Sequence, residues 1–126
     1  MFFFCAYVGV QAQDKLLDST MLAKEKEYTN LADALKVPLK VYRLNLSSQN
    51  LASLPKEIGE LKNLQIFYCS DNQLTSLPKE IGELKNLQVL YCNLNQLNLQ
   101  EKLNIKKLLP NCKIYLVLLR FIRTSF

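Results

Sequence analysis

The residues of this chain with reactive side chains are few, and the cysteines stand out: Cys5, Cys69, Cys92 and Cys112. The sequence has no histidine. Its absence removes the Ser-His-Asp and Cys-His pairs of nucleophilic catalysis and the usual imidazole ligands of zinc, copper and non-haem iron. The three glycines form neither a P-loop nor a dinucleotide-binding fingerprint. The composition therefore predicts no catalytic residues, no metal site and no cofactor.

A repeat organises the middle of the chain. Residues 53–65 read SLPKEIGELKNLQ, and residues 76–88 read the same letters with an offset of 23. The same register extends to residues 41–51 and 87–97 and has the pattern L-x-x-L-x-L-x-x-N-x-L, which is typical of a leucine-rich repeat. One unit cannot bury its own apolar face, so we expect the units to stack. The predicted fold is an α/β, right-handed leucine-rich-repeat solenoid with a short parallel sheet on the concave face and helical N- and C-terminal caps.

Each unit is predicted to contain a short strand and a return segment. An alternating pair of apolar residues marks the half-buried strand; the pairs are Leu44/Leu46, Phe67/Cys69 and Leu90/Cys92. Asn72 and Asn95 mark the turn after the strand, where their amides can satisfy buried backbone groups of adjacent coils. The proline of each LPKEIG segment should start a short 3₁₀ or helical return, and Gly59 and Gly82 should allow its tight corner.

Cys69 and Cys92 occupy leucine positions of the repeat, and Cys112 is predicted to take the equivalent place in the last unit. The favoured interpretation is that these thiols are buried and pack as small hydrophobic groups. A disulfide or a metal site is the alternative. Neighbouring parallel strands would direct the sulfurs of Cys69 and Cys92 the same way, which disfavours a bond between them.

The two ends depart from the repeat, so the chain divides into four segments. Residues 1–12 are apolar and end in V-Q-A, which predicts a signal peptide cleaved after Ala12; a hydrophobic segment packed on the fold is the alternative. Residues 13–40 are a polar lead and a capping helix that begins after Asn30 and stops before Pro38. Residues 41–98 hold the repeats. Residues 99–126 form a C-terminal cap, with a helix over 100–109, a strand over 112–116 and a basic apolar tail.

The repeated LPKEIGELKNLQ segment is similar to that of the short bacterial leucine-rich-repeat proteins of the leptospiral type, whose repeat carries L-P-x-E-I-G-x-L-x-N-L-Q. The resemblance covers roughly residues 28–116, because the flanking segments also resemble the family's entry helix and its closing helix and strand. It implies a horseshoe-like arc without catalytic residues that is secreted or displayed on the outer surface. It also implies binding to host cell-surface or extracellular-matrix proteins, cadherin-like receptors among them. The array here is shorter, and residues 117–126 extend past the usual end.

The outward-facing strand residues are predicted to line the concave face, where solenoid proteins bind their partners. In the repeat register Tyr68 lies beside Tyr91, and Ile66 lies beside Val89. Exposed tyrosines are typical of protein-binding hot spots; the alternative is that they stabilise the sheet by cross-strand stacking. The candidate partner-binding residues are Arg43, Asn45, Ile66, Tyr68, Ser70, Val89, Tyr91 and Asn93, with Ser47 in the first strand.

Charge is distributed unevenly. The formal net charge is +5, and residues 1–100 contain as many basic as acidic side chains. The excess lies in Lys102, Lys106, Lys107, Lys113, Arg120 and Arg123. A solubilising cap is the favoured interpretation, contact of the tail with an anionic membrane is the alternative, and nucleic-acid binding is disfavoured because the rest is neutral. On the return segments, Lys56/Glu60 and Lys79/Glu83 are predicted to be solvated pairs four residues apart.

Together these features predict a monomeric, non-catalytic protein-binding module, which is secreted or displayed on the outer surface as a virulence-associated adhesin. One alternative is a periplasmic or cytoplasmic scaffold that docks an endogenous partner. The other is a membrane-associating protein that uses its C-terminal tail.

Overall fold

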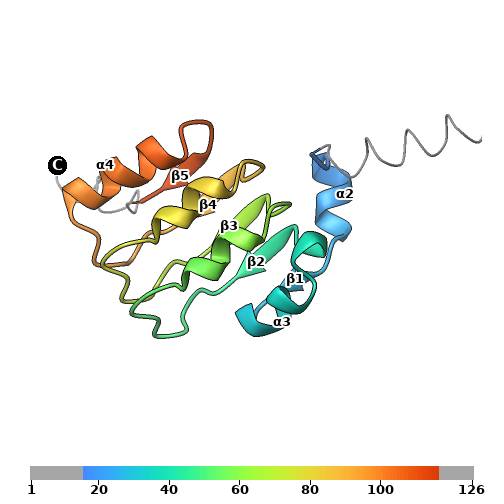
Figure 1. Cartoon of the computed structure of the whole chain (residues 1–126), viewed down its shortest axis with the longest axis horizontal. Coiled ribbons are helices and arrows are strands. Elements are labelled where there is room, and N and C mark those ends of the chain that lie inside the picture. Colours follow the sequence, from blue (N-terminus) through green and yellow to red (C-terminus); the bar gives the residue numbers. More distant parts are fainter. Residues whose placement is uncertain (1–15, 117–126) are drawn as a thin grey trace, which may run out of the picture.

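The computed structural model describes residues 16–116, which stack as successive coils with one parallel sheet in the order β1-β2-β3-β4-β5. A row of helices formed by α3, η2, η3 and α4 runs along the sheet (Figure 1). The elements are α2 (Ser19–Lys24), β1 (Glu27–Tyr28), α3 (Leu31–Lys36), η1 (Pro38–Lys40), β2 (Arg43–Asn45), η2 (Lys56–Glu60), β3 (Ile66–Tyr68), η3 (Lys79–Glu83), β4 (Val89–Tyr91), α4 (Leu99–Leu108) and β5 (Lys113–Tyr115), where η denotes a 3₁₀ helix.

The register of the sheet follows the sequence period. Arg43 pairs with Ile66, and Ile66 pairs with Val89, so both steps equal the 23-residue repeat. The last step pairs Val89 with Lys113 and is one residue longer. Equivalent residues therefore lie side by side, and each strand position becomes a row across the sheet.

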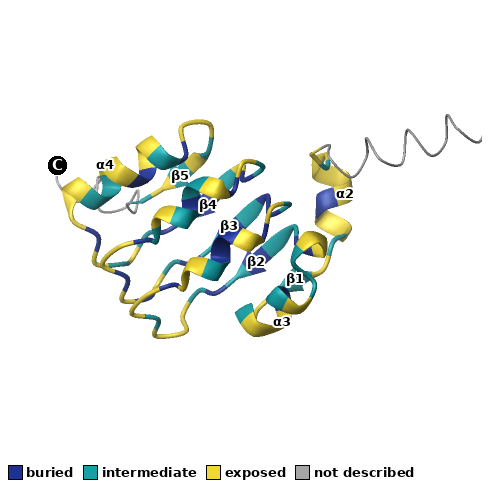
Figure 2. Ribbon diagram, viewed as in Figure 1, coloured by how far each residue is buried: buried dark blue, intermediate teal, exposed yellow. Residues whose placement is uncertain are grey.

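The inward row and the return segments enclose the core. The middle residues of β2, β3 and β4, which are Leu44, Phe67 and Leu90, have no exposed surface. Ile58 in η2 and Ile81 in η3 close the other side and are equally buried (Figure 2). Burying one such side chain contributes about 1.5–3 kcal/mol. Strands of three residues are therefore held by burial in the stack rather than by their own propensity.

The 3₁₀ helices η2 and η3 follow Pro55 and Pro78, which are extended and precede the first helical residue. The prediction that Gly59 and Gly82 supply conformational freedom is wrong, because neither has a positive φ. A Cβ on Gly59 would instead lie 2.9 Å from the carbonyl oxygen of Glu80 in the next coil. Gly59 is therefore required for close approach between coils.

The two predicted capping helices are present. In α3 the side chain of Asn30 accepts a hydrogen bond from the Asp33 N–H at 3.2 Å, and the helix stops before Pro38 as expected. Helix α4 begins one residue before its predicted start, because Asn98 serves as the N-cap and accepts from the Glu101 N–H at 2.8 Å.

The N-terminal lead has more structure than its polar sequence predicted. It contains α2, whose N-cap Asp18 accepts from the Met21 N–H at 2.9 Å, and strand β1. Strand β1 pairs Glu27 with Arg43, an offset of 16 that lies outside the repeat period. The predicted signal peptide at residues 1–12 and the tail at 117–126 lie outside the described residues.

Leu94 has a positive φ of 59°, at the turn position that Asp71 and Ser48 occupy in the preceding units. Leucine is disfavoured in the left-handed region, and this side chain is 52% exposed, so packing does not compensate. We expect Leu94→Asn to raise the free energy of unfolding by about 1 kcal/mol. Urea unfolding followed by circular dichroism measures this.

The matched control for this substitution is Leu103→Asn, which removes an exposed leucine from α4. Asparagine is a poorer helix former than leucine, so the control should lose about 0.5 kcal/mol. An equal loss of stability in both variants would show that the backbone at Leu94 is unstrained.

Candidate functional site

Three tyrosines form one stacked row on the outward face of the sheet, which we call the tyrosine row. The ring centroids of Tyr68 and Tyr91 are 4.7 Å apart, with the planes inclined by 5°. Those of Tyr91 and Tyr115 are 4.8 Å apart at the same inclination. Such stacking contributes about 0.5–1.5 kcal/mol per pair beyond the area buried. The row is therefore both a stabilising feature of the sheet and a rigid aromatic surface.

Sequence reasoning placed Tyr68 beside Tyr91 correctly but missed Tyr115. The spacing from Tyr91 to Tyr115 is 24 rather than 23, so a fixed period does not align them. Alternation in the last strand could have found it, because an inward Ile114 places Lys113 and Tyr115 outward. The Lys113 Nζ lies 5.4 Å from the Tyr115 ring centroid, so a cation borders the row at this end.

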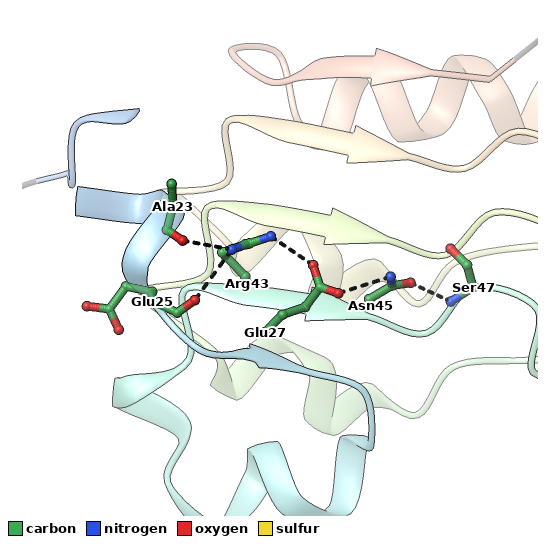
Figure 3. Close-up of polar contacts among 6 residues, drawn as sticks. All are labelled: Ala23, Glu25, Glu27, Arg43, Asn45 and Ser47. Carbon is green, nitrogen blue, oxygen red and sulfur yellow. Dashed lines mark hydrogen bonds and ion pairs between the residues drawn. The ribbon is translucent and has the colours of Figure 1, made fainter. Parts of the chain in front are cut away.

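The two candidate residues on β2 are engaged within the chain (Figure 3). An Arg43 guanidinium nitrogen lies 3.0 Å from Glu27 Oε1, and another donates to the carbonyl oxygens of Ala23 and Glu25 at 3.4 Å. Asn45 Nδ2 donates to Glu27 Oε2 at 3.2 Å. A partner that used Arg43 or Asn45 would have to break these contacts. The outward surface over β4, β5 and the Tyr68 end of β3 is the part that remains available, because α2 lies beside Ile66 at the start of β3.

The polar candidates lie at the carboxyl ends of the strands. Ser70 Oγ donates to Asn93 Oδ1 at 2.7 Å, so these two residues form a fixed polar border beside the tyrosine row. Ser47 contacts Asn45 through its backbone N–H, at 3.1 Å. At the amino-terminal ends of β3 and β4, Ile66 and Val89 pair side by side and are half-buried.

The turn asparagines lie behind this surface and bridge adjacent coils. Asn72 Nδ2 donates to the Leu46 carbonyl oxygen at 2.9 Å, and Asn95 Nδ2 donates to the Cys69 carbonyl oxygen at 3.0 Å. Each amide therefore satisfies a carbonyl of the preceding unit, which a compact turn would leave unpaired. This bridging keeps the strands in register and so keeps the tyrosines aligned.

The described thiols are free and suited to packing. Cys69 and Cys92 are buried. A hydrogen bond that the Cys69 thiol donates to Cys92, together with burial, raises the pKa of Cys69, and the same hydrogen bond lowers the pKa of Cys92. Burial raises the pKa of Cys112 to about 11. Because the thiolate is the reactive form, Cys69 and Cys112 are poor nucleophiles at neutral pH. Within residues 16–116 no group of three His, Cys, Asp or Glu side chains is arranged to hold a metal ion.

The predicted position of Cys112 is wrong. Lys113 pairs with Val89, so Cys112 precedes β5 and aligns with Gln88 rather than with Cys92. The longer last step of the register and the intervening helix α4 account for the difference.

The charged pairs on the return segments also differ from expectation. Lys62 Nζ lies 2.8 Å from Glu83 Oε1, whereas Glu83 had been predicted to pair with Lys79. This hydrogen bond lowers the pKa of the Glu83 carboxyl. Both side chains are about half exposed, so the pair contributes little to stability. Among the described residues, no helix is long and apolar enough to cross a membrane.

The fold and its parallel sheet are those of a leucine-rich-repeat solenoid, and the comparisons agree. The family described as Leucine Rich repeats (2 copies) matches residues 62–107. A solved structure of a leucine-rich-repeat protein from Leptospira interrogans is 48% identical, with a TM-score of 0.60; the match covers 64% of this chain and 21% of that protein. The chain thus spans about a fifth of that protein's length. No curated protein matches.

These findings confirm the predicted fold class, a leucine-rich-repeat solenoid with a parallel sheet. Leucine-rich repeats are generally a protein-interaction fold without catalysis. The comparisons support this general role.

Proposed function

We propose that this protein is a non-catalytic protein-binding module and that the tyrosine row is its main contact surface. The observation that carries this proposal is the stacking of Tyr68, Tyr91 and Tyr115 at 4.7 and 4.8 Å. Aromatic side chains held rigid before binding lose little conformational entropy when a partner arrives. A fixed polar border and an adjoining apolar pair complete the composition of a protein-binding hot spot.

We further propose that the partner is a host cell-surface or extracellular-matrix protein, with cadherin-like receptors as one class. The protein would then be secreted or displayed on the outer surface as a virulence-associated adhesin. Identity of 48% to a protein of Leptospira interrogans and the apolar residues 1–12 support this. Fractionation of the source cells, with detection of the protein outside them, tests the location. Recovery only in the cytoplasm or periplasm would favour a scaffold for an endogenous partner.

The C-terminal charge supports a second candidate function. Lys106, Lys107 and Lys113 are exposed in the described cap, and Lys102 is half-buried there. Arg120 and Arg123 lie outside the described residues. Contact with an anionic membrane would follow from this charge together with the apolar tail. Co-sedimentation with anionic liposomes, with and without residues 117–126, distinguishes this function from protein binding.

The tyrosine row is tested by two paired substitutions. We expect Tyr68→Ala with Tyr91→Ala to weaken partner binding by about a hundredfold, because two central anchors are lost. Tyr68→Phe with Tyr91→Phe keeps the stacked rings and should retain most of the affinity. Binding to host-cell membrane proteins, followed by titration of the purified partner, provides the measurement.

The control for these variants lies on the other side of the solenoid. Lys56→Ala with Lys79→Ala removes two exposed side chains from equivalent positions, the first residues of η2 and η3. This pair should leave the affinity unchanged. If both alanine pairs bind as well as the wild type while circular dichroism shows an intact fold, the tyrosine row is not the contact surface.

A further inference from the structure

Residues 16–24, which we call the strap, lie at the amino-terminal ends of β2 and β3, where they contact Arg43 and Gln65. Gln65, immediately before β3, is only 1% exposed. Its Oε1 accepts from the Leu17 N–H at 2.8 Å, and its Nε2 donates to the Leu17 carbonyl oxygen at 3.2 Å. In Figure 1, α2 stands apart from the row of helices along the sheet. The Gln65 side chain thus binds both backbone polar groups of Leu17, which lies outside any helix or strand just before the α2 N-cap.

This contact does not come from the repeat itself. Gln65 and Gln88 end the two identical SLPKEIGELKNLQ segments, yet Gln88 is exposed while Gln65 is buried. The strap therefore accounts for the difference. It also supplies a hydrogen-bond partner for an amide that burial would otherwise leave unpaired.

Helix α2 adds an apolar and a polar contact at the same surface, which consists of Arg43, Gln65 and Ile66 and which we call the seat. Leu22 is 7% exposed but lies outside the main core, and with Ala23 it lines a pocket shared with Arg43 and Ile66. The Arg43 guanidinium donates to the carbonyl oxygens of Ala23 and Glu25, at the end of α2. The seat therefore recognises three features of the strap, which are the backbone of a non-helical residue, an apolar side chain and the carbonyls at a helix end.

We propose that this seat is a second peptide-binding site and that the strap fills it within the same chain. Its external ligand is a segment of a protein partner with the same pattern: a non-helical residue, an apolar side chain five residues later in a short helix, and unpaired carbonyls where that helix ends. Such a ligand has to displace the strap. Its apparent affinity is therefore reduced by the fraction of molecules in which the seat is open. The site uses no tyrosine of the tyrosine row and goes beyond the function proposed above.

The test uses the full chain and a synthetic peptide of residues 16–26 as the probe. Leu22→Asp puts a charge on the strap and leaves every residue of the seat unchanged. We expect the peptide to bind the Leu22→Asp protein at least about tenfold more tightly than the wild type, whose seat is occupied. Leu17→Pro removes the N–H that Gln65 accepts from and should open the seat in the same way.

The identical repeats provide the control on the seat. Adding Gln65→Ala to Leu22→Asp should weaken peptide binding by about tenfold, whereas adding Gln88→Ala should not change it. Equal peptide binding to wild type and both strap variants, binding to none of them, or equal loss with Gln88→Ala would overturn the proposal. Tyr68→Ala with Tyr91→Ala in the Leu22→Asp protein should leave peptide binding intact, so the two proposed surfaces fail independently.

Discussion

Replacing Asn72 with alanine is expected to lower the free energy of unfolding by about 3 kcal/mol. Asn72 Oδ1 accepts from the backbone N–H groups of Gln49 at 3.0 Å and Leu51 at 2.9 Å. Its Nδ2 donates to the carbonyl oxygens of Leu46 at 2.9 Å and Cys69 at 3.1 Å. The side chain is 7% exposed, so water replaces few of these bonds when the amide is removed. Several backbone groups would be left buried without partners.

Asn95→Ala is the matched comparison, because Asn95 occupies the same turn one repeat later. It is half-buried and its Oδ1 accepts from one backbone N–H, that of Leu74 at 3.0 Å. We expect this variant to lose about 1–2 kcal/mol. Urea titration of both variants, followed by circular dichroism, gives the difference. A loss below about 1 kcal/mol for Asn72→Ala would show that water reaches these groups.

Gly59→Ala is expected to destabilise the fold by about 2 kcal/mol. The added Cβ would lie 2.9 Å from the carbonyl oxygen of Glu80 and 3.0 Å from its Cβ. These are a backbone atom and the first side-chain atom, so the coils η2 and η3 must move apart. Replacing glycine lowers the conformational entropy of the unfolded chain, which stabilises the fold by about 0.4–1 kcal/mol and only partly offsets this cost.

Gly82→Ala places the same substitution in an identical sequence with a different neighbour. Its Cβ would meet Leu108 Cδ2 at 3.2 Å, and the end of a leucine side chain can shift. We expect a change within about 1 kcal/mol of zero. Thermal unfolding of both variants makes the comparison. Equal destabilisation would indicate a requirement of the 3₁₀ turn itself rather than of the contact between coils.

The candidate surface was predictable wherever the repeat period applied. Tyr68 and Tyr91 could be placed side by side because identical spacing puts equivalent residues in one row of a parallel sheet. Tyr115 could not be placed in this way, because helix α4 lengthens the last step by one residue. The ion pair between Arg43 and Glu27 could not be predicted either, because β1 pairs with β2 at an offset unrelated to the repeat.

The burial of Gln65 by the strap could not be predicted from the local sequence. Gln65 and Gln88 have the same twelve residues before them, and nothing in that segment distinguishes their surroundings. Gln65 is buried because residues 16–24 return to it across 48 positions of the chain. A contact of this length leaves no periodic signal in the sequence.

The sequence by itself determined the class of fold, the core rows and the capping helices, because apolar periodicity and N-cap chemistry are local properties that repetition makes easy to read. It also determined the absence of histidine chemistry. Only the tertiary structure decided which outward residues are free to contact a partner and why Gly59 must be a glycine. It also decided that the N-terminal lead adds a strand to the sheet and packs beside it. Those outcomes depend on contacts between segments that are not equivalent in the repeat. Such contacts follow from packing rather than from the repeat period.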